Sequence, residues 1–258
     1  PVLIQRLIPG NLGYEQAGVY SQAFRLLDAG QNFAYLFAVL LLPLFAKMIA
    51  GNENVEQLVK LSFSLLVSGT IIIAIATSCY SEQIMLLMYN QMPNESLAHF
   101  TLRIHQSSVI FSVLMFSFVA ISSNYIFGTL LTANNNMKLL NFVAMGGVII
   151  NMGLNFYLIP KFQSVGSAYA GMSAQIFTAI IQLILAYRIF KFKVNYSLIA
   201  RFIALVVLLT IGAYVIKNQM SMNWKYGLLM LFVEGLLASL LLRLWNLREL
   251  FKILTSKQ

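Results

Sequence analysis

The sequence predicts an all-α integral membrane protein, a polytopic bundle of about seven transmembrane helices. Hydrophobic residues make up 59% of the 258 positions and charged residues only 10%, against about 25% charged in ordinary soluble domains. Because lipid cannot satisfy backbone polar groups, long apolar runs are expected to be helical. Five runs lack Asp, Glu, Lys and Arg altogether and are long enough to cross a bilayer: 29–46, 61–81, 106–137, 139–160 and 162–187.

Two further spans and several polar turns complete the predicted order of elements. Residues 202–216 form a shorter charge-free run, and 224–243 contain a single carboxylate, Glu234. Polar turns separate the spans, and Pro160 is expected to end one of them. In chain order we expect the stub of a truncated helix (1–9), a short turn rich in Gly and Asn (10–16), an interfacial helix at 81–89, and spans at 15–50, 57–80, 104–132, 137–159, 164–191, 197–217 and 223–243.

The C-terminal residues 244–258 are typical of an amphipathic helix. Leu247, Leu250 and Leu254 share one face, and Arg248 and Lys252 lie on the other. We expect this segment to lie in the cytoplasmic interface; a frayed, solvated tail is the alternative.

The basic residues divide unequally between the two ends of the predicted spans, 6 against 11. By the positive-inside rule the richer end is cytoplasmic, so the C-terminus is predicted to be inside. The net charge of +9 is therefore interpreted as an orientation signal, and nucleic acid is not expected as a partner. The richer end carries Lys47, Lys60, Lys138, Arg188, Lys191, Lys193, Arg201, Arg243, Arg248, Lys252 and Lys257; the other carries Arg6, Arg25, Arg103, Lys161, Lys217 and Lys225.

No pattern of enzyme residues appears, so we expect no catalytic residue, metal or cofactor. His99 and His105 have no companions at metal-ligand spacing. The single cysteine, Cys79, excludes an intrachain disulfide and is expected to be a small buried residue.

Polar side chains inside the spans are the candidate functional residues, since such groups are costly in lipid and tend to face the bundle interior or water. Arg25 and Asp28 are close enough in sequence to pair on one helix face, with Gln22 nearby. They could form a cationic, hydrogen-bonding wall for an anionic or sugar-bearing substrate. Alternatively, this amphipathic segment simply projects beyond the outer interface.

Other polar residues have both a cavity-lining and a structural interpretation. Asn151 and Asn155 are one turn apart, and Gln175 shares a stripe with Thr178 and Gln182. Interhelical hydrogen bonds are the alternative to a cavity for each of them, and for the serine-rich span at 104–132. Glu234 could be a proton or cation site, or could have a structural partner. A ridge of small residues, Gly166, Ala170 and Ala174, is expected to let two helices approach closely.

Two stretches resemble bacterial polysaccharide flippases of the O-antigen and capsule type, within the multidrug/oligosaccharidyl-lipid/polysaccharide (MOP) superfamily. Residues 17–26, AGVYSQAFRL, followed by LPLFA at 42–46, resemble the "vGxYsxAxkl … P" region. Residues 151–160, NMGLNFYLIP, followed by VGSA at 165–168, resemble the more specific "NxxLNxxLIPxxGxxGAA" signature. The sequence departs from that signature at Gln163-Ser164, where the family often has Gly, and at Ser167.

The resemblance implies a six-helix C-terminal lobe at 1–191, an additional helix pair at 192–243 and the tail at 244–258, with an N-terminal lobe missing from this chain. It implies a transporter in the bacterial inner membrane that flips undecaprenyl-diphosphate-linked oligosaccharide by alternating access, beside the polymerase or glycosyltransferases of polysaccharide biosynthesis. Arg25, Gln22, Asn151, Asn155 and Gln175 would then bind substrate, and Asp28 or Glu234 an ion or proton.

Three alternatives stay open at this point. A peptidoglycan lipid II flippase and a cation-coupled multidrug exporter are both transporters, and acidic cavity residues in the missing lobe would favour the exporter. A membrane glycosyl polymerase would be an enzyme and would need a large outer loop with clustered charges. The 81–103 connection is too short and too weakly charged for that.

Overall fold

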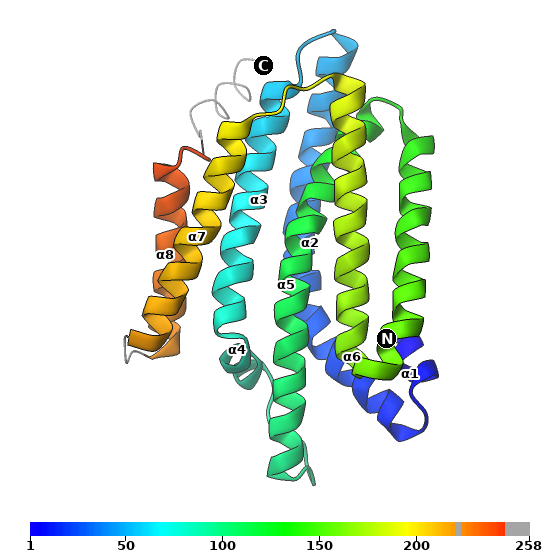
Figure 1. Ribbon diagram of the computed structural model, residues 1–258, viewed down its shortest axis with the longest axis vertical. Coiled ribbons are helices and arrows are strands. Elements are labelled where there is room, and N and C mark those ends of the chain that lie inside the picture. The colour runs from blue at the N-terminus through cyan, green and yellow to red at the C-terminus, as the bar shows by residue number, and fades with distance from the viewer. Residues whose placement is uncertain (220–222, 246–258) are drawn as a thin grey trace.

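A computed structural model describes residues 1–219 and 223–245, and helices form nearly all of these ranges (Figure 1). The prediction of an all-α polytopic membrane protein is confirmed, because six helices are long and apolar enough to span a bilayer. The helices are α1 (Val2–Leu7), α2 (Asn11–Ala50), α3 (Glu56–Cys79), α4 (Ser81–Met88), α5 (Leu97–Ala133), α6 (Met137–Phe190), α7 (Tyr196–Gln219) and α8 (Trp224–Leu241).

The longest helix, α6, is a hairpin of two helical arms. Gln163 has non-helical dihedral angles (φ 52°, ψ −133°) and divides the arms 137–162 and 164–190, which run antiparallel (Figure 1). Pro160 lies within the last turn of the first arm, so the helix continues slightly beyond the predicted stop. Counted by arms, seven long segments alternate in direction, in agreement with the spans that the charge-free runs predicted.

The predicted turn at 10–16 is wrong, because α2 already begins at Asn11. Residues 8–10 make the turn, and Gly10 has a positive φ of 69° that few other residues adopt. At Gly13 the backbone of α2 lies very close to the end of α1, because a Cβ there would be 2.5 Å from the Ile8 carbonyl oxygen. One glycine therefore helps to reverse the chain and a second lets α2 pack against α1.

The helix α5 also begins earlier than predicted, at Leu97 rather than near residue 104. Ser96 provides the cap, because its Oγ accepts a hydrogen bond from the backbone N–H of His99 at 3.2 Å. The helix predicted at 81–89 is observed as α4.

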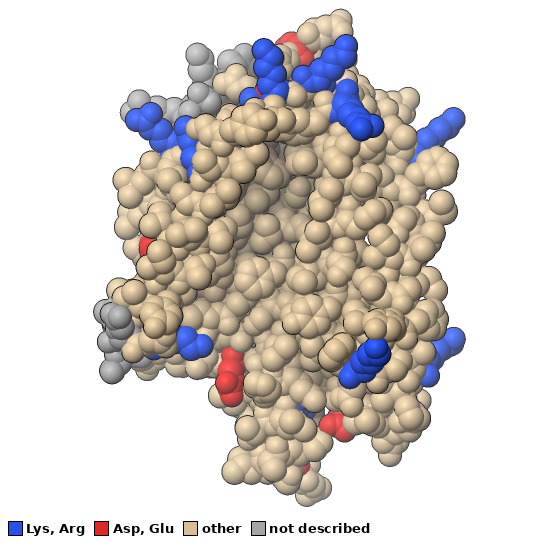
Figure 2. All heavy atoms as spheres, in the orientation of Figure 1, with Lys and Arg blue, Asp and Glu red and all other residues tan. Residues whose placement is uncertain are grey.

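The loops gather at two ends of the bundle. Residues 51–55, 134–136 and 191–195 lie at the end uppermost in Figure 1, together with the end of α8; we call it the upper end. The helices α1 and α4 and the turn at Gln163 lie at the lower end. Several basic side chains rim the upper end (Figure 2). Most of the predicted tail, from residue 246 onward, lies outside the described residues, and Arg248, Lys252 and Lys257 with it.

Packing divides the helices into two groups. The helix α5 packs extensively against α2, α3 and α6, and its apolar side chains fill the main core. The pair α7 and α8 packs against α3 and against itself. The ridge of Gly166, Ala170 and Ala174 is buried, and a Cβ at Gly166 would meet the backbone of Leu158 in the other arm of α6. This observation confirms its predicted role in close helix packing.

Candidate functional site

The densest polar cluster lies at the lower end, where α2 meets the start of α5; we call it the end cluster. It consists of Glu15, Gln22, Glu95, His99 and Arg103. The guanidinium of Arg103 donates to both carboxylate oxygens of Glu95, at 2.8 and 2.9 Å. It also donates to the Gln22 side-chain oxygen at 3.3 Å. The two charged side chains are only 5% and 7% exposed, so the pair is a buried, bidentate link.

Glu95 is held as a carboxylate by this arrangement. The Arg103 hydrogen bonds lower the pKa of Glu95 to about 2, with further help from the Met92 backbone N–H and from His99. His99 places one ring nitrogen 2.8 Å from Glu15 and the other 3.3 Å from Glu95. The imidazole therefore bridges a carboxylate of α2 and a carboxylate of the 89–96 loop.

Beside the end cluster lies a cavity of about 740 Å³ whose lining includes all five cluster residues. Arg103, the arginine that lines this cavity, is already neutralised by its ion pair with Glu95. The loop is also tied to α2 through Tyr89, whose hydroxyl donates to the Gln22 carbonyl oxygen at 2.9 Å. The arrangement suits fixing the loop on α2 and hydrogen bonding to a polar ligand group, and no proton or group transfer is apparent from it.

The predicted cationic wall on α2 is divided between two environments. Gln22 belongs to the end cluster, whereas Arg25 and Asp28 are both exposed on α2. Among the described residues no ion pair joins Arg25 to Asp28 or to another carboxylate. One further contact of this part of α2 is made by Tyr35, whose ring meets Tyr125 of α5 edge-on, with 6.1 Å between the ring centroids.

Asn151 and Asn155 contact each other within the first arm of α6. The Asn155 side-chain amide donates to the Asn151 carbonyl oxygen at 2.7 Å and to its side-chain oxygen at 2.9 Å. Asn155 is 3% exposed, and its own Oδ1 has no hydrogen-bond partner among the described protein atoms. Asn151 faces Gly171 in the second arm, where a Cβ would lie 3.9 Å from its Nδ2. The two amides thus lie inside the α6 hairpin.

Gln175 links α6 to α5. The Asn124 side-chain amide donates to the Gln175 side-chain oxygen at 2.9 Å and to its carbonyl oxygen at 3.3 Å. This is the interhelical alternative to a cavity-lining role. Gln182, which follows Thr178 in the same stripe, is 8% exposed and packs against Gly128 of α5.

Four serines of α5 satisfy their hydroxyls within the helix. Ser107, Ser108, Ser112 and Ser122 each donate to a carbonyl oxygen three or four residues earlier. These side chains therefore add little free hydrogen-bonding capacity to a substrate path.

Glu234 lies in the contact between α8 and α7. Its carboxylate is placed against Gly212, where a Cβ would collide with both carboxylate oxygens. The residue is partly buried, and no hydrogen bond or ion pair to it occurs within the described part of the chain. Glu234 is far along the chain from the other predicted site residues and belongs to a different helix group.

A polar link that the sequence pattern did not suggest joins three helices. Gln16 of α2 is 3% exposed and donates to Gln106 of α5 at 3.0 Å. Ser164 of α6 donates to the Gln16 side-chain oxygen at 2.5 Å. Because these three residues lie on separate helices, their spacing in the sequence does not predict the contact. By contrast, the spacing of Glu95, His99 and Arg103, at intervals of four, could have indicated the end cluster.

The chain matches no protein-family model and no curated protein sequence. In the described ranges, moreover, no three His, Cys, Asp or Glu side chains are placed to hold a metal ion.

Proposed function

We propose that this protein is a membrane transporter that flips an oligosaccharide linked to undecaprenyl diphosphate from the inner to the outer leaflet, and that this chain supplies one lobe of it. The observation that carries the proposal is the exposed polar face of α2. Arg25, Asp28 and Asn32 share this face and all three are exposed. Charged and amide groups are costly against lipid, so this face needs a water-filled path or a second lobe to cover it.

Arg25 is the residue best placed to meet a diphosphate. It is exposed, and no carboxylate pairs with it among the described residues. Gln22 and Gln175 already engage Arg103 and Asn124, so they would have to exchange these contacts for sugar hydroxyls. Asn151 and Asn155 would contribute from the α6 hairpin, which contains the stretch that resembles the flippase signature.

In this proposal the upper end faces the cytoplasm of a bacterial inner membrane. The sequence assigns more basic residues to that end than to the lower end, which is the asymmetry of cytoplasmic loops. The substrate and a companion lobe would be the partners, with the enzymes of polysaccharide assembly nearby. Asp28 or Glu234 would supply the site for a coupling ion or proton.

Replacing Arg25 tests the proposal in cells whose surface polysaccharide depends on this protein. Arg25→Ala in the full-length protein should lower surface polysaccharide about tenfold, because a charge-assisted hydrogen bond to phosphate contributes about 1.5–3 kcal/mol. Arg25→Lys should retain most of the output. Arg6→Ala is the matched control, since Arg6 is also basic, exposed and at the lower end. Unchanged polysaccharide in Arg25→Ala cells with normal protein levels would contradict the proposal.

A further inference from the structure

The two helix groups leave a furrow between α6 and α7. The helix α7 packs on α3 and α8, whereas the second arm of α6 packs on α5, and α6 and α7 have no extensive contact with each other in the described chain. Figure 2 shows the molecule hollowed along this line below the upper rim. The furrow is therefore open laterally, toward the lipid.

The inside of the furrow is apolar. A cavity of about 490 Å³ near the upper end is lined by aromatic and aliphatic side chains from four helices, including Phe63, Phe127, Leu183 and Phe202. A second cavity of about 490 Å³ shares Phe63 and continues toward the middle of the helices. Ser123 is the one polar residue among the described residues that line this deeper part. Each volume lies within the range of about 300–1,000 Å³ that is usual for ligand pockets.

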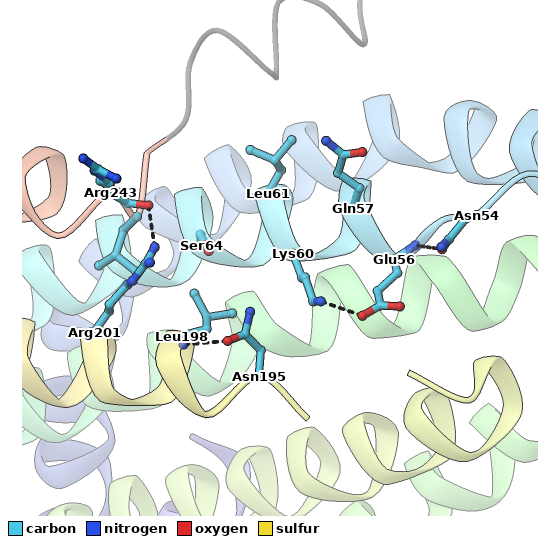
Figure 3. A pocket seen from close by; sticks show the side chains of 11 residues that line it. Asn54, Glu56, Gln57, Lys60, Leu61, Ser64, Asn195, Leu198, Arg201 and Arg243 are labelled. Atoms are coloured by element: carbon cyan, nitrogen blue, oxygen red, sulfur yellow. Dashed lines mark hydrogen bonds and ion pairs between the residues drawn. The ribbon is translucent and has the colours of Figure 1, made fainter. Parts of the chain in front are cut away.

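Basic side chains lie at the upper mouth of the furrow and in a polar cavity that adjoins it. Lys60 and Arg188 line the first apolar cavity. Lys60 also lines an adjoining polar cavity of about 450 Å³, which lies between α3, α7 and the residues that follow α8 and has no α6 residue in its described lining (Figure 3). Arg201 and Arg243 line this second cavity, where the Arg201 guanidinium donates to the Arg243 carbonyl oxygen at 3.3 Å. Among the described lining residues of both cavities, Glu56 is the one carboxylate, and it pairs with Lys60 at 2.5 Å. Across the two adjoining cavities, four cations face one carboxylate, which leaves an excess of positive charge around Lys60.

The furrow is basic at its upper end and apolar below it, and a phospholipid has a matching arrangement of a charged head group and apolar chains. Arg188 lies in the last turn of α6 and Arg201 in the second turn of α7, both at the upper end. The apolar cavities extend from this level toward the bilayer centre. A head-group phosphate at the interface would therefore meet the basic groups while an acyl chain follows the apolar lining.

We propose that the furrow between α6 and α7 binds an anionic phospholipid, with its phosphate among Lys60, Arg188 and Arg201 and one acyl chain in the apolar cavities. Arg and Lys are the usual ligands of phosphate, and basic pockets between membrane helices on the cytoplasmic side bind anionic head groups. An apolar protein helix in the furrow would leave these cations without counter-charges. A zwitterionic head group would bring its own cation to the mouth and bind more weakly. The site does not depend on the proposed transport, since the α2 face with Arg25 does not contribute to it.

The charge requirement can be measured with the full chain in nanodiscs of phosphatidylcholine containing a minor fraction of phosphatidylglycerol. Native mass spectrometry would count the phosphatidylglycerol molecules that stay bound after release from the disc. The double substitution Arg188→Gln/Arg201→Gln should weaken retention about thirtyfold, from the effect of two basic residues at a membrane surface. Lys47→Gln/Lys138→Gln removes the same charge from exposed upper-end positions outside the furrow, and should leave retention unchanged. Equal loss in both variants would overturn the proposal in favour of general surface attraction.

The acyl-chain requirement needs a second variant with all charges intact. Ile184 lines the first cavity and is 41% exposed, so Ile184→Trp should fill the furrow without disturbing the core. It should reduce phosphatidylglycerol retention, whereas Leu139→Trp, on an exposed position of the other α6 arm, should not. Wild-type retention in Ile184→Trp would overturn the proposal. Displacement of the lipid by soluble glycerol phosphate would also overturn it, since the site would then bind phosphate without a chain.

Discussion

Two groups of helices are held together by different kinds of contact. One group consists of α2, α5 and α6, and the other is the pair α7–α8, which packs on α3. In the first group, side chains on different helices are hydrogen-bonded, as in Gln16–Gln106 and Asn124–Gln175. The pair α7–α8 attaches to α3 mainly by apolar packing, with hydrogen bonds among the described residues only near its ends, from Lys217 to the Cys79 carbonyl oxygen and from Trp245 to the Ser68 hydroxyl. Within a bilayer apolar contact alone gives little preference for a helix over lipid. The first group is therefore expected to be the rigid part, and the pair the part whose position depends on its surroundings.

The largest effect on the rigid group is expected at Gly166. Gly166→Ala should lower the free energy of unfolding by about 3 kcal/mol, because the added Cβ meets the Leu158 backbone and not a movable side chain. Thermal unfolding in detergent would measure the change. Gly153→Ala is the control, since no atom lies within 4 Å of a Cβ at that position; it should be neutral or slightly stabilising. Equal destabilisation by both substitutions would contradict the close packing of the α6 arms.

The second effect concerns the end cluster. Arg103→Gln should lower the free energy of unfolding by ~2 kcal/mol at neutral pH, through the loss of hydrogen bonds to a charged group. The pKa of Glu95 is depressed to about 2, so its stabilising contribution is present above the ordinary carboxyl pKa. The stabilising contribution of Glu95 is lost as the pH falls from the ordinary carboxyl pKa toward 2.

The pH profile separates this ion pair from a purely structural role of Arg103. The melting temperature of the wild type should fall between about pH 4.5 and pH 2, and that of Arg103→Gln should fall less over the same range. Parallel pH profiles of the melting temperature for the two proteins would show that the low pKa of Glu95 does not depend on Arg103.

The smallest effect is expected where α7 meets α8. The atoms nearest to a Cβ at Gly212 belong to the carboxylate of Glu234, which is the movable end of a side chain. Gly212→Ala should therefore be nearly neutral, because the gain in helix propensity of about 1 kcal/mol offsets the displaced carboxylate. In a Glu234→Ala background the same substitution should stabilise by about 1 kcal/mol. The double-mutant cycle measures this coupling, and additivity of the two substitutions would exclude the contact.

The helices could be predicted from the sequence because each span is a run without charges between polar turns. The observed bounds differ by a few residues at most of the ends. The larger errors, at Asn11 and Leu97, arose where a helix extends past the apolar run into polar sequence, since hydropathy marks the membrane and not the end of the helix. Gly10 and Ser96, which set those two starts, are local signals that the apolar pattern does not contain.

The site was less predictable, because periodicity assigns a residue to a helix face and does not say which helix that face meets. Gln22 and Arg25 are three residues apart, yet one is bonded to Arg103 and the other is exposed. Gln175 has its partner, Asn124, on another helix. The four-residue spacing of Glu95, His99 and Arg103 indicates a contact among them, but these residues precede the apolar part of α5 and lie outside the predicted span.

The short links at the upper end have a consequence for how the chain is threaded through the membrane. Residues 191–195 join α6 to α7, and five extended residues reach at most about 18 Å, well short of the roughly 30 Å hydrocarbon layer. The three-residue link 134–136 and the reversal at Gln163 are shorter still. From α5 to α7, each segment must therefore insert opposite to the one before it, whatever the flanking charges favour. A single cysteine placed in 191–195 and probed with an impermeant reagent would orient all of these segments at once.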